Sequence, residues 1–369
     1  MGGPLRILHV VVNMNRGGAE TLIMNLYRNI DRSKVQFDFL TCKEGVFDTE
    51  ISELGGKVFR IPYITDVGHF KYLKELKKFF TKNNHYKIIH SHMDKMSGLV
   101  LREAKKAGIP NRISHSHNTS SEGGAASRIY KWYAGNFILS SATDLFACSN
   151  EASEWLFKQK STVSKILKNG IECNHFIFSE TVRKEVREEL NINSNSIVLG
   201  HVGRFATQKN HSFLLEIFAE INKNKNNSVL LLVGDGPLRS DLEKRAVDLK
   251  VRDKIKFVGI RNDINRILQA FDLFVFPSLH EGLPVSLIEA QGAGLPCVIS
   301  ENISKEVDLG CNLVEFLPLN NKEIWVKRIN NIAEQKTVRK AYSTVITEQG
   351  FNISETAQKI EDYYLRYSG

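Results

Sequence analysis

Cysteine is scarce and unpaired in this 369-residue chain. The five cysteines are odd in number and lie far apart, and no C-x-x-C spacing occurs. This pattern excludes a disulfide framework and argues against a zinc knuckle. We therefore expect reduced thiols, as in a protein that stays in the cytoplasm.

Long apolar runs are also missing. No run approaches the roughly 20 residues that a membrane-spanning helix needs. Residues 1–6 contain no apolar core of the kind that a signal peptide requires. We expect neither a membrane helix nor a signal peptide.

Positive charge is in modest excess and is unevenly distributed along the chain. The formal net charge is +9. Residues 1–180 hold 25 Lys and Arg against 17 Asp and Glu, whereas residues 181–369 hold 25 against 24. The first half is therefore expected to face anions, such as phosphorylated substrates or an anionic membrane surface. Nucleic acid is a poor candidate, because the charge is not gathered in a recognised binding module.

Two common phosphate-binding motifs are absent. The chain has neither G-x-G-x-x-G nor the Walker sequence G-x-x-x-x-G-K-[S/T], which disfavours a standard dinucleotide-binding domain and a P-loop nucleotide hydrolase. Hydrophobic residues make up 42% and charged residues 25%, as in ordinary globular proteins. At about 150 residues per domain, the length predicts roughly two domains.

Short β-branched runs alternate with helical stretches from end to end, which predicts an α/β protein with parallel sheets. A charged segment at 179–190 and a polar turn at 191–195 separate two such series of strands and helices. We expect two doubly wound Rossmann-like domains, 1–175 and 196–350, joined by a linker at 176–195 and facing each other across a cleft that holds the ligand. The predicted strands are 5–12, 35–41, 57–61, 87–91 and 112–116 in the first domain, and 197–202, 229–233, 255–258, 273–276 and 297–300 in the second.

Glu281 and Glu289 flank the start of a predicted helix in which Pro284 occupies the first turn. A carboxylate can accept hydrogen bonds from two neighbouring hydroxyls, so one glutamate suits a sugar and the other a ribose. The alternative is a capped helix with Glu289 on a solvated face. The amides that would form an anion site at this helix start are those of Gly282, Leu283 and Val285.

A predicted strand ends near Gly203, and Arg204 and Lys209 follow in a loop before a helix. Arginine supplies a bidentate fork and lysine a point charge, a combination typical of a diphosphate clamp. Two solvated basic residues beside a turn are the alternative. Gly17 and Gly18, after the first strand, allow a close approach of backbone to ligand or simply form a tight turn.

Two H-x-H pairs, His90/His92 and His115/His117, lie at the ends of predicted strands, each pair on one face. We expect one or two of these imidazoles to form hydrogen bonds with a sugar. A zinc site is the lesser alternative, because no acidic or cysteine partner has matching spacing. His92, and Asn118 directly after His117, are candidates for contacts with acceptor or sugar.

A basic amphipathic helix is predicted around residues 70–80. Leu73, Leu76 and Phe80 recur at helical spacing, with lysines between Lys71 and Lys78. Such a helix can lie on anionic lipid. A surface helix packed on its own sheet is the alternative.

Together these segments resemble the family 4 glycosyltransferases of the two-domain GT-B fold, and within them bacterial capsule and exopolysaccharide enzymes. The resemblance covers nearly the whole chain, and its pieces occur in the family's order. The matching residues are 17–20, 117–119, 169–172 with Phe176, 203–204 with Lys209, 234–237, 257–259 and the pair Glu281/Glu289.

The resemblance implies a role for each candidate residue. Arg204 and Lys209, with Gly203 and the amides near Gly282 and Leu283, would hold the diphosphate of a nucleotide sugar. Glu289 would bind the ribose, and the backbone at Ile260 and Arg261 would meet the base. Catalytic contacts with the transferred sugar or its leaving group are expected from His117, Arg204, Lys209 and Glu281.

The resemblance also implies positions for segments distant from these residues. Gly17 and Gly18 would line the cleft beside the donor, and Pro284 and Val285 would complete the donor-binding loop. A C-terminal helix at 353–369 would pack back onto the first domain.

The implied activity is retaining transfer of a hexose or N-acetylhexosamine from a nucleotide diphosphate sugar, UDP-linked by expectation, to a glycan acceptor. The acceptor would be lipid-linked, at the inner membrane face, in cell-surface polysaccharide biosynthesis. No metal or other cofactor is expected, because Arg, Lys and helix amides can stabilise charge on the leaving diphosphate.

Two other functions stay open at this point. An epimerase or hydrolase of the same architecture would convert the donor with no acceptor present. A non-catalytic nucleotide-sugar-binding partner would bind the donor without turnover.

Overall fold

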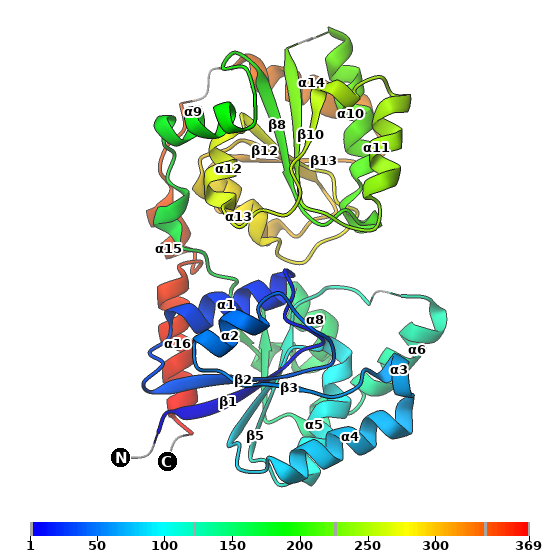
Figure 1. Ribbon diagram of the computed structural model, residues 1–369, viewed down its shortest axis with the longest axis vertical. Helices are drawn as coiled ribbons and strands as arrows, with labels where there is room; N and C mark the ends of the chain where they lie inside the picture. Colours follow the sequence, from blue (N-terminus) through cyan, green and yellow to red (C-terminus); the bar gives the residue numbers. More distant parts are fainter. Residues whose placement is uncertain (1–2, 122, 225–226, 336–337, 368–369) are drawn as a thin grey trace. The chain divides into compact units, whose positions relative to one another are not determined.

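The computed structural model describes residues 3–121, 123–224, 227–335 and 338–367. The chain divides into two compact units (Figure 1). The first unit comprises Met1–Gly170 and Asn352–Gly369, and the second comprises Ile171–Phe351. Each unit is built around its own parallel sheet, as alternation of strands and helices requires.

The first unit holds a seven-stranded sheet in the order β3-β2-β1-β4-β5-β6-β7, with every neighbouring pair parallel. The order runs outward in both directions from β1, which is the doubly wound arrangement. The strands are β1 (Leu5–Val10), β2 (Val35–Thr41), β3 (Val58–Arg60), β4 (Ile88–Ser91), β5 (Asn111–Ser116), β6 (Asp144–Ala147) and β7 (Lys165–Ile166).

The second unit repeats the plan with six parallel strands in the order β10-β9-β8-β11-β12-β13. The strand order reverses direction between β8 and β11, which is the topological switch point of this sheet. The strands are β8 (Ile197–Val202), β9 (Ser228–Val233), β10 (Ile255–Phe257), β11 (Leu273–Phe276), β12 (Cys297–Ser300) and β13 (Val314–Leu317).

Helices connect and cover both sheets (Figure 1). Those of the first unit are α1 (Gly18–Asn29), α2 (Asp48–Glu53), α3 (Ile64–Val67), α4 (His69–Lys82), α5 (Ser97–Lys106), α6 (Ala125–Gly135), α7 (Ile138–Ser141), α8 (Asn150–Phe157) and α16 (Ile353–Leu365). Those of the second unit are α9 (Glu180–Glu189), α10 (His211–Asn224), α11 (Arg239–Asp248), α12 (Ile264–Ala270), α13 (Val285–Gly292), α14 (Lys322–Glu334) and α15 (Ser343–Glu348).

All ten predicted strands are present, within two residues at each end. Three further strands, β6, β7 and β13, were not predicted. They are two to four residues long and include charged residues such as Asp144 and Lys165, so they offer no β-branched run to detect.

Residues 176–195, expected as a linker, contain α9 instead, and this helix belongs to the second unit. Arg183 donates to Asp272 Oδ1 at 2.5 Å, and Arg187 donates to Asp272 Oδ2 at 2.8 Å. The aliphatic Val186 is fully buried between them. The charged segment therefore packs as a helix because its arginines find a carboxylate across the unit.

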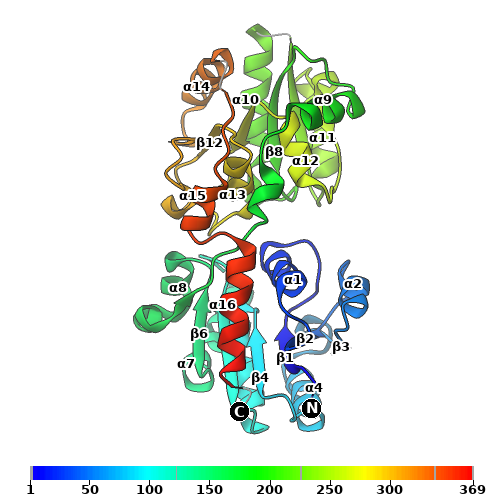
Figure 2. The same ribbon diagram turned by 90° about the vertical axis from the view of Figure 1, so that its left-hand side faces the viewer.

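The C-terminal helix α16 packs on the first unit and lies alongside α1 (Figure 2). Ile353, Ala357, Ile360 and Tyr364 join the core that contains Ile7 and Phe37. Residues 368 and 369, which the expected helix included, lie outside the described residues.

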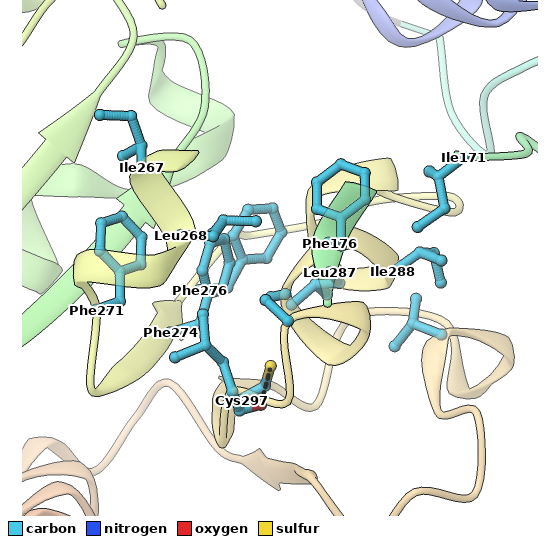
Figure 3. Close-up of a cluster of buried hydrophobic side chains, with 14 of the residues drawn as sticks. Ile171, Phe176, Ile267, Leu268, Phe271, Phe274, Phe276, Leu287, Ile288 and Cys297 are labelled. Carbon is cyan, nitrogen blue, oxygen red and sulfur yellow. Dashed lines mark hydrogen bonds between the residues drawn. The ribbon is translucent and has the colours of Figure 1, made fainter. Parts of the chain in front are cut away.

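The core of the second unit supports the helix that carries Glu289. Phe274 and Phe276 from β11 belong to the same buried cluster as Leu287 and Ile288 from α13 (Figure 3). All four side chains have no exposed surface. Packing of this kind fixes α13 against the sheet.

Gly200 in β8 offers a test of this packing. A Cβ at position 200 would lie 1.9 Å from a ring carbon of Phe271, so Gly200→Ala forces the ring or the strand to move. We expect a loss of about 1–3 kcal/mol in the free energy of unfolding, measured by urea titration. Gly3→Ala, where a Cβ meets nothing within 4 Å, is the control. Equal stabilities of the two variants would contradict the packing described.

Candidate functional site

Four loops of the second unit leave the carboxyl ends of parallel strands and meet at one edge of the sheet, where ligands of such sheets bind. Gly203, Arg204 and Lys209 follow β8. The loop after β9 contains Gly234, that after β10 contains Ile260 and Arg261, and that after β11 contains Glu281–Val285.

Lys209 and Glu281 form an ion pair across two of these loops. The Nζ atom lies 2.7 Å from Glu281 Oε1, and the two side chains are only 16% and 11% exposed. Within the part of the chain that the structure describes, this oxygen accepts no aligned hydrogen bond, so the pair is held by charge rather than by directed bonding. The ammonium also lies 4.6 Å from the centre of the Phe276 ring, within cation–π range.

A neutral histidine, His201, lies near the Lys209 side chain. His201 donates from Nδ1 to the carbonyl of Val275 at 2.8 Å. Burial lowers the pKa of His201 to about 3. The imidazole therefore adds no positive charge next to Lys209, and the lysine and Arg204 carry the cationic character of this edge.

Arg204 is exposed, and its guanidinium has no partner among the described residues. The loop that carries Arg204 nevertheless packs tightly against the loop after β9. Gly234 has a φ of +131°, and a Cβ there would lie 2.1 Å from the carbonyl oxygen of Gly203. Only glycine fits this contact, which presses the loop after β9 against the backbone that carries Arg204.

Gln208 joins the loop after β8 to the loop after β11. Its carbonyl accepts from the amide of Leu279 at 2.8 Å, and its side-chain amide donates to the carbonyl of His280 at 2.9 Å. The backbone of Glu281 also forms an isolated parallel β-bridge with that of Ile303, which follows β12. These bonds fix the backbone on both sides of the Lys209–Glu281 pair. Sequence reasoning missed Gln208, whose role depends on a partner about 70 residues away.

The helix that carries Glu289 begins one residue later than expected. Pro284 is the N-cap of α13 rather than its first helical residue, with φ −70° and ψ 116°. Val285 is therefore the first helical position. Gly282 and Leu283 lie in the turn directly before the cap, so their amides stay near the helix start as expected.

Glu289 is an isolated carboxyl group inside α13. Its side chain is partly accessible to solvent, but its surroundings desolvate it enough to raise its pKa to about 7. No hydrogen bond or ion pair to this carboxyl is found within the described ranges. A carboxylate with a raised pKa at a ligand-binding sheet edge marks a candidate binding group.

Ile260 is 58% exposed beyond β10. The Arg261 guanidinium, by contrast, is engaged, because it bonds Asp263 at 2.8 and 2.7 Å and Glu189 at 2.8 Å. The side chain of Arg261 is thus tied to its own unit, and its backbone remains the group available to a ligand.

Gly17 and Gly18 open α1 directly after the loop that follows β1. Gly17 is the N-cap, and a Cβ there would lie 2.3 Å from the carboxyl oxygen of Glu20. Gly18 is exposed, and a Cβ there would meet nothing within 4 Å. Within this unit, it is therefore Gly17 whose backbone lies close to another group, the Glu20 carboxyl. Gly18 has open space around it.

Four buried histidines and the partly exposed His117 gather at the carboxyl edge of the first sheet. His9 of β1 adds a fifth ring to the two expected pairs. Strand β1 lies beside β4 (Figure 2), and His9 is level with His90. His9 Nδ1 is 2.9 Å from His92 Nε2, and His92 Nδ1 is 2.9 Å from His117 Nε2. His90 bonds His115 at 3.1 Å and the hydroxyl of Tyr364 at 2.6 Å.

Burial keeps these imidazoles neutral. Desolvation lowers the pKa of His9 and of His117 to about 3, and desolvation with mutual repulsion lowers those of His90, His92 and His115 well below the ordinary value. His9 was missed in the sequence, although a histidine inside the apolar run 5–12 was a usable signal.

Two trios of ring nitrogens are close enough to consider a metal: His9/His90/His92 and His92/His115/His117, each within 4.8 Å. One nitrogen–nitrogen separation in each trio, His9–His92 and His92–His117, is 2.9 Å, the length of a hydrogen bond. Two nitrogen ligands at about 2.0 Å from one tetrahedral zinc lie about 3.3 Å apart. An ion would therefore have to push the rings apart, and the arrangement is that of a hydrogen-bonded chain.

Asp94 holds the segment that carries His117 and Asn118. Its Oδ1 accepts from the amide of His117 at 3.0 Å, and its Oδ2 accepts from the side chain of Asn118 at 2.5 Å. Asp94 itself has φ +45°, a conformation that non-glycine residues rarely adopt. Sequence reasoning missed it, because neither this φ nor these contacts leave a pattern in the chain.

Comparison with known proteins agrees with the two-unit division. The model of the Glycosyl transferase 4-like domain matches residues 17–164, and that of Glycosyl transferases group 1 matches residues 182–349. EpsF of Bacillus subtilis is 36% identical over 97% of this chain and 96% of its own length.

The chain belongs to the family 4 glycosyltransferases. Two further relatives of this glycosyltransferase are 28% identical over 98% of its chain. One is the UDP-Gal:alpha-D-GlcNAc-diphosphoundecaprenol alpha-1,3-galactosyltransferase of Escherichia coli, covered over 97% of its length. The other is the capsular polysaccharide biosynthesis glycosyltransferase CapH of Staphylococcus aureus, covered over 99%.

Solved structures give the glycosyltransferase the GT-B fold. HepE from Anabaena, crystallised in complex with UDP-glucose, superposes with a TM-score of 0.74 at 19% identity, over 98% of this chain and 96% of HepE. Among the residues described for this glycosyltransferase, none of the helices is both long and apolar enough to cross a bilayer.

The raised pKa of Glu289 predicts a pH-dependent stability. Because the folded pKa is about 7 against 4.5 for a free glutamate, the folded state binds the extra proton between these values. The contribution of Glu289 to the free energy of unfolding therefore falls as pH rises from about 4.5 to 7. Urea titrations from pH 5 to 8 should show Glu289→Gln gaining stability over wild type as pH rises.

Glu188→Gln, which removes one charge from the exposed face of α9, is the control for that experiment. Parallel stability curves for wild type and Glu289→Gln across this range would contradict the desolvated state assigned to Glu289.

Proposed function

We propose that this glycosyltransferase moves a hexose or N-acetylhexosamine from a UDP-sugar to a lipid-linked glycan, with retention of the anomeric configuration, in cell-surface polysaccharide synthesis. The observation that carries the proposal is the pairing of Lys209, in the loop after β8, with Glu281, in the loop that leads into α13. Arg204, in the same loop as Lys209, is exposed and has no partner among the described residues. The proposal assigns no resident metal or cofactor to the reaction.

The relatives support the choice of donor and acceptor. HepE was crystallised with UDP-glucose, and the E. coli relative is named for a UDP-galactose donor and a diphosphoundecaprenol-linked acceptor. CapH is named for capsular polysaccharide biosynthesis. An acceptor on a lipid carrier would place the reaction at the inner face of the cell membrane.

The second unit can stabilise the leaving group. Negative charge grows on the diphosphate as its bond to the anomeric carbon breaks. Arg204 and Lys209 would meet that charge, and the amides near Gly282 and Leu283 would add donors at the start of α13. Groups already in place stabilise the transition state more than the ground state, which is what accelerates transfer.

The two glutamates would bind the rest of the donor. When a phosphate takes the ammonium of Lys209, the Glu281 carboxylate is released to accept from hydroxyls of the sugar. Glu289, ionised above about pH 7, would accept from the two ribose hydroxyls. The base would lie along the backbone at Ile260 and Arg261.

Retention follows in this proposal if the departing phosphate takes the proton of the acceptor on the face that it leaves. His117 would then hold the sugar, with His92 and Asn118 near sugar or acceptor. Gly17 and Gly18 would border the donor, as the family resemblance implies.

Arg204→Ala tests the diphosphate assignment. Removing one preorganised donor from a developing oxyanion typically costs about 10²–10³ in kcat. We expect a loss of that size in a transfer assay with UDP-sugar and lipid-linked acceptor. Arg245→Ala, which removes an exposed arginine of α11 that pairs with Glu216 of α10, should retain wild-type turnover.

Unchanged turnover of Arg204→Ala would refute the assignment. Conversion of the donor in the absence of acceptor would favour an epimerase or hydrolase. Donor binding without turnover across an acceptor panel would favour a non-catalytic partner.

A surface of the first unit suits an anionic membrane. The apolar stripe of α4 faces inward, with Leu76 and Phe80 fully buried, so Lys71, Lys74, Lys77 and Lys78 are left exposed. Phe70, at the start of α4, is 87% exposed. His69 bonds Tyr130 of α6, which brings this end of α4 close to α6.

Helix α6 adds apolar side chains that face water. Ile129 and Trp132 are 66% and 58% exposed. Lysines beside exposed aromatic residues are the combination that binds the interface of an anionic bilayer. We infer that this surface holds the enzyme near its lipid-linked acceptor.

Flotation with vesicles tests the membrane surface. Wild type should float with anionic phosphatidylglycerol vesicles at low salt and be released at high salt. Replacing the four α4 lysines by glutamine should abolish flotation, because each is worth about 1 kcal/mol near such a surface. The matched control replaces Lys184, Lys244, Lys250 and Lys327 of the second unit by glutamine and should float normally.

Equal flotation of the two quadruple variants, or no flotation of wild type at low salt, would leave the α4 lysines as ordinary solvated residues.

A further inference from the structure

The histidine chain of the first unit allows only two arrangements of its protons. His9, His92 and His117 are linked in series by two hydrogen bonds of 2.9 Å. Each neutral imidazole has one N–H and one bare nitrogen. If His9 donates to His92, then His92 must donate to His117. If His117 donates to His92, then His92 must donate to His9. The three rings therefore share one tautomeric state.

Each arrangement leaves a different nitrogen with an unused proton. In the first, His117 carries it on Nδ1, and His9 Nε2 is bare. In the second, His9 carries it on Nε2, and His117 Nδ1 is bare. Both of these end nitrogens are buried and have no hydrogen-bond partner among the described residues. The question is which end can tolerate an N–H.

The His9 end has no means of satisfying a donor. His9 has no exposed surface, and the rings around it are those of Phe37, Phe39, His90 and Tyr364. The hydroxyl of Tyr364 already bonds His90. A buried N–H without an acceptor is rarer in proteins than a buried acceptor without a donor. A bare Nε2 is therefore the better state for His9.

The His117 end differs because it lies directly beyond β5, at the carboxyl edge of the sheet. His117 is partly exposed, whereas His9 is not. Ligands of parallel α/β sheets bind at this edge, so an acceptor for the Nδ1 proton can arrive with the substrate.

We propose that His9 and His92 act as positioning residues that fix His117 as the Nδ1–H tautomer, so that His117 donates a hydrogen bond to an oxygen of the bound sugar and does not act as a base. The proposal rests on the proposed function only in taking the sugar as the ligand that His117 meets. The second branch, from Tyr364 through His90 to His115, has no hydrogen bond to His117 among the contacts of the described residues.

Nitrogen NMR of the ring nitrogens tests the tautomer without any substrate. The full-length protein, labelled with ¹⁵N-histidine and kept with a chelator to remove adventitious metal, is compared with His117→Gln to assign His117. We expect a protonated Nδ1 and a bare Nε2. A bare Nδ1, or equal populations of the two tautomers, would overturn the proposal. Because no sugar is present, this result is independent of the proposed transferase activity.

Variants of His9 test the linkage. His9→Phe fits the surrounding rings but removes the donor to His92, so His117 should populate both tautomers. With UDP-sugar and acceptor, kcat should fall about tenfold, the equivalent of one hydrogen bond, while the KM for the donor changes little. His9→Gln restores an N–H at the same place and should recover both the tautomer and most of kcat.

His90→Gln is the matched control, because His90 is equally buried on the neighbouring strand but belongs to the other branch. It should lower the melting temperature yet preserve the His117 tautomer and kcat. If His90→Gln and His9→Phe reduce kcat equally, or if His9→Phe leaves the His117 tautomer unchanged, the chain has only a structural role and the proposal fails.

Discussion

The ion pair between Lys209 and Glu281 is the interaction on which the second unit's candidate site depends. It joins the loop after β8 to the loop after β11, and both side chains are largely withdrawn from water. Removing one partner of such a pair leaves a poorly solvated charge, which is costly. In the proposed function, a phosphate that binds Lys209 competes with Glu281 for the ammonium, and a Glu281 carboxylate released in this way would accept from a sugar hydroxyl. The pair would then link the arrival of the anion to the exposure of an acceptor for the sugar.

The scaffold around this pair is rigid and nearly uncharged. Gln208 ties the two loops through backbone atoms, and Gly234 presses a third loop against Gly203. His201 is held neutral by burial, with its pKa lowered to about 3. The positive charges of this edge are therefore those of Arg204 and Lys209, whose loops are held by these contacts. In the proposed function, such placement would be the preorganisation that stabilises a leaving group.

The local pattern of apolar and polar residues predicted most of the strands. The features that it did not predict depend on contacts between residues that are far apart in the sequence. Residues 273–276 are an apolar run and the first five residues of 35–41 alternate between apolar and polar, and both strands were predicted to the residue. The segment that forms α9 reads as a solvated linker because it is highly charged. It packs only because Arg183 and Arg187 reach Asp272, more than 80 residues away.

The same limit applies within the site. Arg204, Lys209, Glu281 and Glu289 stand at strand ends and helix starts, positions that a sequence reveals. The Lys209–Glu281 pairing, the tie through Gln208 and the support from Asp94 depend on side-chain geometry across loops. His9 depends on register, because the pairing of β1 with β4 brings it level with His90.

Unsatisfied polar groups distinguish the parts of the molecule that await a ligand from those that only fold it. Buried polar atoms are normally paired, so each exception needs a reason. His9 Nε2 and His115 Nε2 are unpaired but enclosed by rings, and a bare nitrogen there costs little. His117 Nδ1 and the desolvated Glu289 lie instead where parallel strands end. In the functions proposed above, His117 would donate to an oxygen of the sugar, and Glu289 would accept from hydroxyls of the ribose.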